Sequence, residues 1–172
     1  MKRTLMTLTA FVALAAWASA QAPTGGPSAA EELKHLKANR TLLEDLVNHS
    51  VRVAEAETPL DRADRCREAT GSLKRALQDA GDDPDRVVEL IENLAAMIKN
   101  GLAPTLARAR QEIPRGSHDY ERMKKLHVDV RQDLTLVQEA IPTTGKAAKS
   151  APVNDARQQL LNVTATVPTI AD

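Results

Sequence analysis

Apolar residues recur at steps of three and four along most of the chain, which is the spacing of one face of an α-helix. The first series follows Ser28-Ala29-Ala30-Glu31, a pattern typical of a capping box at a helix start. It predicts a helix to about residue 55, with Arg40 and Ser50 filling two places in its apolar stripe. The apolar members of that stripe are Leu33, Leu36, Leu43, Val47 and Ala54. We expect this stripe to face the core.

Two further helices begin at proline-led starts. Thr58-Pro59 fits the N-cap and first position of a helix that Gly81 ends. Asp83-Pro84 predicts the next helix, whose apolar stripe continues to about residue 113. Gly101 and Pro104 interrupt that stripe, because proline lacks the N–H that a helix interior needs. The stripe resumes with little change of phase, so we predict a kink and treat both residues as hinge candidates; the alternative is that the helix ends there.

A fourth helix is predicted from Ser117 to Ile141, where Pro142 ends it. Its inward stripe is Tyr120, Met123, His127, Val130, Leu134, Val137 and Ile141. Residues 143–172 are rich in small and polar residues and predict a flexible tail, with a short helix near Leu160 as an alternative. No strand pattern appears. The sequence therefore predicts an all-α fold, an antiparallel up-down four-helix bundle over residues 28–142.

The first 20 residues have the layout of a secretory signal peptide. Lys2 and Arg3 precede an apolar run, and Ala18-Ser19-Ala20 supplies small residues at the cleavage positions. An uncleaved anchor would need about 20 apolar residues. Gln21, rather than a lipid-attachment cysteine, follows the predicted cleavage site and opens a flexible lead over residues 21–27. We expect an exported protein, periplasmic or secreted, without a membrane anchor after signal cleavage.

The charge and the aromatic content of the chain restrict the kinds of partner and cofactor that it is expected to bind. The chain has 23 basic and 23 acidic residues, and loss of the signal leaves a small negative charge, so nucleic acid is not an expected partner. Phe11 and Trp17 would leave with the signal. Tyr120 would then be the one remaining residue among Phe, Trp and Tyr. Stacking platforms and most cofactor pockets use aromatic rings, so the sequence predicts an aliphatic core and no cofactor.

Sequence motifs for catalysis are missing from the chain. It contains no HExxH, GxSxG, P-loop, GxGxxG, CxxC or CxxCH pattern. We therefore expect a protein that is not an enzyme. The amphipathic helices predict protein–protein interaction with a client, a partner or a second copy of the chain.

Histidines raise an alternative, a periplasmic bundle that carries haem or a metal ion. His127 occupies an inward position one turn after Met123, where it could be a core ligand. It could equally be a neutral histidine bonded to a carbonyl or carboxylate of a neighbouring helix. Glu32 and His35 have ligand spacing on one helix, and His49 follows on the same face. For Glu32 and His35 the alternative is a solvated helix face, whereas His35 and His49, with Asp45 one turn before His49, could form a surface metal patch.

Cys66 is the one cysteine of the chain, so no internal disulfide is expected. It falls on an inward position, where cysteine usually packs as a small hydrophobic residue. If exposed in an oxidising compartment, it would form an intermolecular disulfide. The sequons at Asn39, Asn48 and Asn162 would matter only in a eukaryotic secretory pathway.

Overall fold

The computed structural model describes residues 29–169, and before Asn39 it describes the side chains of Leu33 and Lys37 alone. The predicted signal peptide (1–20), the lead (21–27) and the cap at Ser28 lie outside the described residues. All regular structure within the described range is helical, which confirms the all-α prediction for that range. None of these helices is long and apolar enough to cross a membrane.

The helices begin and end close to the predicted positions. Thr58, Asp83 and Ser117 are N-caps with extended backbone, and the side chain of each accepts a hydrogen bond from a backbone N–H in the first helical turn. Gly81 has a φ of +64°, which suits its place beyond the second helix. The elements are α1 (Ala29–Glu55), α2 (Pro59–Asp79), α3 (Pro84–Met97), η3 (Ile98–Leu102), α4 (Ala103–Glu112), α5 (His118–Ala140), α6 (Gly145–Lys149) and α7 (Ala151–Thr164).

The segment around Pro104 remains helical. One π-turn, η3, joins α3 to α4, and the N–H of Ala103 bonds to the carbonyl of Ile98. The hydroxyl of Thr105 donates to the carbonyl of Gly101 at 2.7 Å. A π-turn is a common way for a helix to absorb a local disturbance without ending. The helix therefore continues through Gly101 and Pro104, while their action as a hinge stays a prediction.

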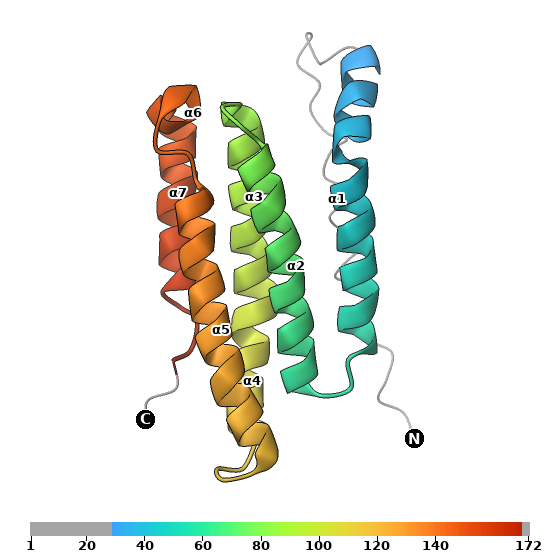
Figure 1. Ribbon diagram of the computed structural model, residues 1–172, viewed down its shortest axis with the longest axis vertical. Helices are drawn as coiled ribbons and strands as arrows, with labels where there is room; N and C mark the ends of the chain where they lie inside the picture. The colour runs from blue at the N-terminus through green and yellow to red at the C-terminus, as the bar shows by residue number, and fades with distance from the viewer. Residues whose placement is uncertain (1–28, 170–172) are drawn as a thin grey trace. The chain divides into compact units, whose positions relative to one another are not determined.

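The core lies among α2, α3, η3, α4, α5 and α7, which run alongside one another (Figure 1). It is aliphatic, as predicted. Most residues of the predicted stripes on α2, α3, α4 and α5 are buried, and the exceptions include Tyr120 and His127, which are half-buried. Large side chains with almost no exposure are Leu73, Leu77, Leu90, Ile91, Leu94, Ile98, Leu102, Leu106, Met123, Ile141 and Leu160.

Residues 145–164 are more helical than the expected flexible tail, and the short helix suggested near Leu160 lies within α7. They form α6 and α7, and α7 packs against α3 with Val153, Ala156 and Leu160 buried. Asp82, in the turn between α2 and α3, accepts hydrogen bonds from the backbone N–H groups of Lys146 and Ala147, both at 2.8 Å. This cap fixes the start of α6. The linker-like composition belongs to residues 143–151, which are rich in small and polar residues, whereas α7 carries the apolar residues that pack.

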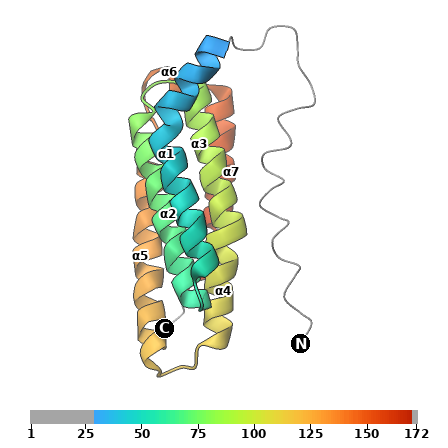
Figure 2. The same cartoon turned by 90° about the vertical axis from the view of Figure 1, so that its right-hand side faces the viewer.

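The first helix also differs from expectation, in its orientation. From Arg40 onward α1 lies along α2 (Figure 2), and the side chains that pack against the core are Leu42, Leu46 and Val53. The predicted core stripe faces outward instead. Its apolar members from Arg40 onward, Leu43, Val47 and Ala54, are all exposed. Both sets have helical spacing, so periodicity alone could not choose between them.

Candidate interaction surface and histidine sites

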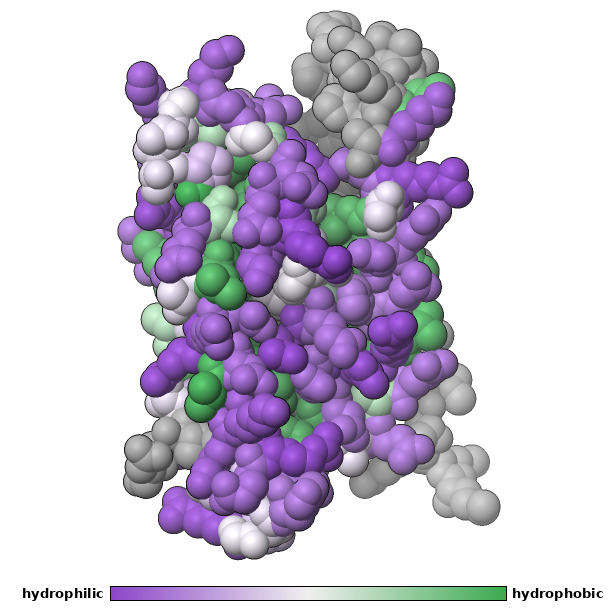
Figure 3. Space-filling model, in the orientation of Figure 1, coloured by the Kyte–Doolittle hydropathy of each residue, from purple (hydrophilic) through white to green (hydrophobic). Residues whose placement is uncertain are grey.

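The outward face of α1 carries a row of exposed aliphatic side chains. Leu43, Val47 and Val51 are 47%, 61% and 49% exposed, and we call them the α1 outer row. Steps of four residues place them on one helix face. Arg40 and Glu44 form an ion pair of 2.8 Å beside the row. Hydrophobic residues reach the surface along the α1 edge of an otherwise mostly hydrophilic face (Figure 3).

The opposite face of α1 meets α2 through a group of polar side chains that we call the polar seam. Its centre is Ser72, whose hydroxyl donates to Asp45 at 3.4 Å and accepts from Arg75 at 2.9 Å. The Nε2 atom of His49 lies 3.0 Å from the same oxygen. Arg75 also pairs with Asp45 at 3.7 Å. The polar seam consists of Asp45, His49, Ser72 and Arg75, with the Arg52–Glu68 ion pair at 3.8 Å extending it.

Serine, histidine and aspartate meet in the polar seam, but their order differs from that of a catalytic triad. In a triad the histidine accepts the serine proton, and the aspartate holds the other ring nitrogen. Here Asp45 lies 3.4 Å from the Ser72 hydroxyl oxygen instead of bonding to Nδ1 of the histidine. The Nδ1 atom of His49 has no partner among the described residues. Ser72 is 3% exposed, and the arrangement joins two helices rather than activating a nucleophile.

The surface metal patch stays a prediction, because it includes His35. Asp45 and His49 are engaged in the polar seam, and the side chains of Glu32 and His35 lie outside the described part of the structure. No group of three or more His, Cys, Asp or Glu suited to a metal ion occurs among the side chains that the structure describes.

His127 lies at the edge of the core rather than inside it. The neighbouring Leu126 takes the buried position, and His127 is half-buried. Its Nδ1 is 2.9 Å from the backbone carbonyl of Met123, so Nδ1 carries the proton. Burial lowers the pKa of His127, and the nearby positive charges of Arg110 and Arg131 lower it further. The hydrogen bond to the Met123 carbonyl acts in the opposite direction and raises the pKa, but the net shift is downward. The result is a neutral imidazole bonded to its own helix, whereas the sequence suggested a neighbouring helix.

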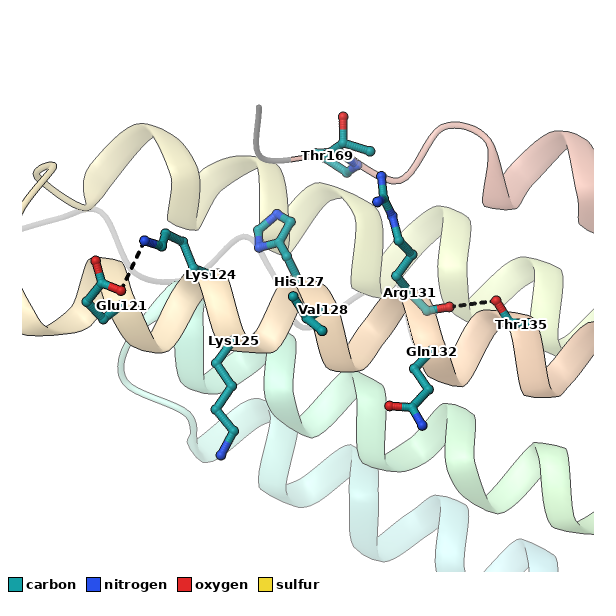
Figure 4. A pocket seen from close by; sticks show the side chains of 10 residues that line it. Glu121, Lys124, Lys125, His127, Val128, Arg131, Gln132, Thr135 and Thr169 are labelled. Atoms are coloured by element: carbon teal, nitrogen blue, oxygen red, sulfur yellow. Dashed lines mark hydrogen bonds and ion pairs between the residues drawn. The ribbon is translucent and has the colours of Figure 1, made fainter. Parts of the chain in front are cut away.

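A shallow groove of about 630 Å³ runs beside His127 (Figure 4). It is formed by α5 and by Pro168 and Thr169 of the C-terminal segment. The only carboxylate of its lining, Glu121, pairs with Lys124 at 3.1 Å. The Nε2 atom of His127 has no hydrogen-bond partner among the described residues. The α5 residues that line the groove are Glu121, Lys124, Lys125, His127, Val128, Arg131, Gln132 and Thr135.

Cys66 is a free, buried thiol on α2. Burial raises the pKa of its thiol, and the methyl group of an alanine at position 101 would lie 3.2 Å from its sulfur. Gly101 thus lets η3 approach α2 closely, a packing role that the sequence did not reveal. A buried, protonated thiol is a poor partner for a second chain, because exchange needs an accessible thiolate.

Comparison with family models, with curated proteins and with solved structures finds no match to this chain. Its function therefore has to be argued from the α1 outer row, the polar seam and the groove. Sequence reasoning included Leu43 and Val47 of the α1 outer row in a stripe predicted to face the core, and it did not single out Val51. The polar seam was missed because Ser72 and Arg75 carry no motif of their own.

Proposed function

We propose that the protein is an exported, non-enzymatic bundle of helices that acts by binding another polypeptide through the outer face of α1. The α1 outer row is the observation that carries this proposal. Three aliphatic side chains on successive turns stay about half or more exposed, although the same helix packs half-buried Leu42, Leu46 and Val53 against the core on its other side. Contiguous apolar patches on the surface of a soluble protein often mark sites of interaction.

Energetics support a binding role for α1. Covering apolar surface is worth roughly 25 cal/mol per Å², so a partner that covers the α1 outer row gains favourable free energy. An amphipathic helix with anchors on successive turns is a common recognition element for another helix or a groove. The Arg40–Glu44 pair beside the row would lie at the rim of such an interface, where charges favour the correct partner.

The architecture that we propose is an antiparallel up-down arrangement of four long helices. Its members are α2, the continuous α3–η3–α4 segment, α5 and α7, joined by short connections. This set replaces the predicted one, because α7 takes the place that the sequence gave to α1. In this arrangement α1 lies outside the four helices, with one face free for a partner.

Export is part of the proposal and has its own test. The basic start, apolar run and Ala18-Ser19-Ala20 of residues 1–20 support signal cleavage. The intact mass of the protein recovered from the extracytoplasmic fraction of the producing cell should correspond to a chain that begins at Gln21. A full-length chain found in the cytoplasm would contradict export.

Site-specific photo-crosslinking tests the binding role. A photoreactive amino acid at Val47, in the centre of the α1 outer row, should give a covalent adduct with a polypeptide in the native compartment. The same probe at Val128, which is 66% exposed on α5, is the matched control. The proposal predicts a discrete adduct at position 47 and none at position 128. Equal labelling, or no adduct at position 47, would contradict it.

A second candidate function is a bundle that carries haem or a metal ion at His127. One observation favours it, the unpartnered Nε2 atom beside the groove. Haem or a metal ion would use this atom as a ligand. Elemental analysis and the visible absorption spectrum of protein from a haem-replete host test whether His127 binds a metal ion or haem. A Soret band or bound metal that disappears in His127→Ala would establish this function.

A further inference from the structure

The α1 outer row is symmetric about its central residue. Leu43 lies four positions before Val47 and Val51 lies four positions after it. Arg40 and Ala54 lie seven positions before and after, close to the same face. Two copies of this helix placed antiparallel around a two-fold axis at Val47 would set Val47 against Val47 and Leu43 against Val51. A surface that complements itself in this way is the requirement for a two-fold dimer.

Charges at the two ends of the same face favour the antiparallel direction. Arg40, which is paired with Glu44 at 2.8 Å, begins this part of α1 and Glu55 ends it, and all three side chains are exposed. In the antiparallel arrangement, the Arg40 end of one helix lies beside the Glu55 end of the other. A parallel pair would place Arg40 against Arg40 and Glu55 against Glu55. Opposite charges across a helix pair set its orientation, and like charges weaken it.

We infer that the polypeptide bound by the α1 outer row is a second copy of this chain, paired antiparallel through Val47. The inference rests on the proposed function and names its partner. The interface would be small, because one helix face of about four turns falls below the area of a stable obligate dimer. The dimer is therefore reversible and depends on protein concentration. The polar seam stays within each copy and holds α1 in place.

Sedimentation equilibrium of the full mature chain over a wide concentration range tests this pairing. The average molar mass of the unmodified chain should rise with protein concentration from that of a monomer toward that of a dimer. Val47→Asp would bring two carboxylates together at the two-fold axis and should weaken association more than tenfold. Val128→Asp, at an exposed valine on α5, should leave association unchanged. Because both valines are more than half exposed, the far-UV circular dichroism of both variants should match that of the unmodified chain.

Cysteine cross-linking tests the direction of the pair. In a Cys66→Ala background, Val47→Cys should form a covalent dimer with an added oxidant. Leu43→Cys alone should not, whereas an equimolar mixture of Leu43→Cys and Val51→Cys should. Self-cross-linking at all three positions would indicate a parallel pair and overturn the register.

A chain that stays monomeric at every concentration, and whose Val47→Cys variant forms no covalent dimer, would overturn self-pairing. The photo-crosslinking experiment at Val47 separates that outcome from failure of the proposed function. An adduct of twice the chain mass supports self-pairing. An adduct with a different polypeptide contradicts self-pairing and leaves the binding role of the α1 outer row standing.

Discussion

The helices α1 and α7 show that a longer helix need not bury more of its side chains. The longer, α1, has 27 residues, and none of its described side chains is fully buried. The shorter, α7, has 14 residues, yet Val153, Ala156 and Leu160 are buried against α3. The helix with the more extensive apolar pattern is thus the peripheral one. Core membership depends on which neighbours a face meets, and a periodic pattern does not reveal that.

The two helices also differ in the chemistry that holds them. The buried contacts of α7 are aliphatic, Gln138 of α5 donates to Thr164 at 3.4 Å, and the Asp82 cap at α6 fixes the approach of α7. The inner face of α1 combines half-buried aliphatic residues with the hydrogen bonds and ion pairs of the polar seam. Exposed ion pairs contribute at most about 1 kcal/mol each, and partial exposure of Asp45 and Arg75 keeps their hydrogen bonds to Ser72 at the low end of about 1–3 kcal/mol. We therefore expect α1 to detach at a lower free energy than α7.

The largest effect should come from Leu160→Ala in α7. Leu160 is fully buried, so its truncation leaves a cavity as well as losing apolar contact. The free energy of unfolding, measured by urea denaturation, should fall by about 2–5 kcal/mol. The matched control is Leu43→Ala in the α1 outer row, expected to change stability by less than about 0.5 kcal/mol. Similar losses in the two variants would refute the contrast between the helices.

A smaller loss is expected from Gly145→Ala at the start of α6. Gly145 has a φ of +85°, and a methyl group there would collide with the carboxylate of Asp82. The left-handed conformation alone costs a non-glycine residue roughly 1–2 kcal/mol. The midpoint of urea unfolding should fall accordingly. Gly71→Ala in α2, where a methyl group meets nothing within 4 Å, is the control that should not destabilise.

The polar seam should contribute about 1 kcal/mol. Ser72→Ala removes the oxygen shared by Asp45, His49 and Arg75 and leaves Nε2 of His49 without this hydrogen-bond partner. We expect the loss to appear as easier opening of α1, seen as faster amide exchange in residues 42–53. Exchange in α7 should be unchanged. Equal acceleration in α1 and α7 would show that the seam supports the whole fold.

The mildest effect concerns pH. Burial lowers the folded-state pKa of His127 below its ordinary 6.5, so the unfolded chain takes up the proton first as the pH falls. The stability contributed by neutral His127 is complete above pH 6.5 and declines as the pH falls toward the folded-state pKa. His127→Gln should therefore make the free energy of unfolding less sensitive to pH between about 7.5 and about 5.5. An unchanged or steeper dependence would contradict this assignment.

Local signals predicted much of the fold. The caps at Thr58, Asp83 and Ser117 placed the helix starts, because each needs only a side-chain oxygen near the first N–H groups. The orientation of α1 could not be predicted, because the stripe that contains Leu42 and the stripe that contains Leu43 both have helical spacing. The packing of α7 depends on a cap from Asp82, 64 residues before Lys146, and no local pattern reports it.

The candidate site was less accessible to sequence reasoning. His127 was identified as a residue to examine, but its bond to the Met123 carbonyl and the proximity of Arg110 and Arg131 depend on tertiary structure. The α1 outer row was visible only as a stripe, and its exposure could not be inferred. Sequence analysis treated Cys66 as an inward residue of one helix and Gly101 as a hinge candidate of another. It could not reveal that the two residues lie close together where α2 packs against η3.

Native-state hydrogen exchange of the dilute, monomeric chain tests the central contrast most directly. The account predicts that amides around Val153–Leu160 exchange only through global unfolding. Amides around Leu42–Val53 should exchange through a local opening of lower free energy that depends little on denaturant. Protection of α1 equal to that of α7, with the same denaturant dependence, would contradict a peripheral α1 and remove the basis for its binding role.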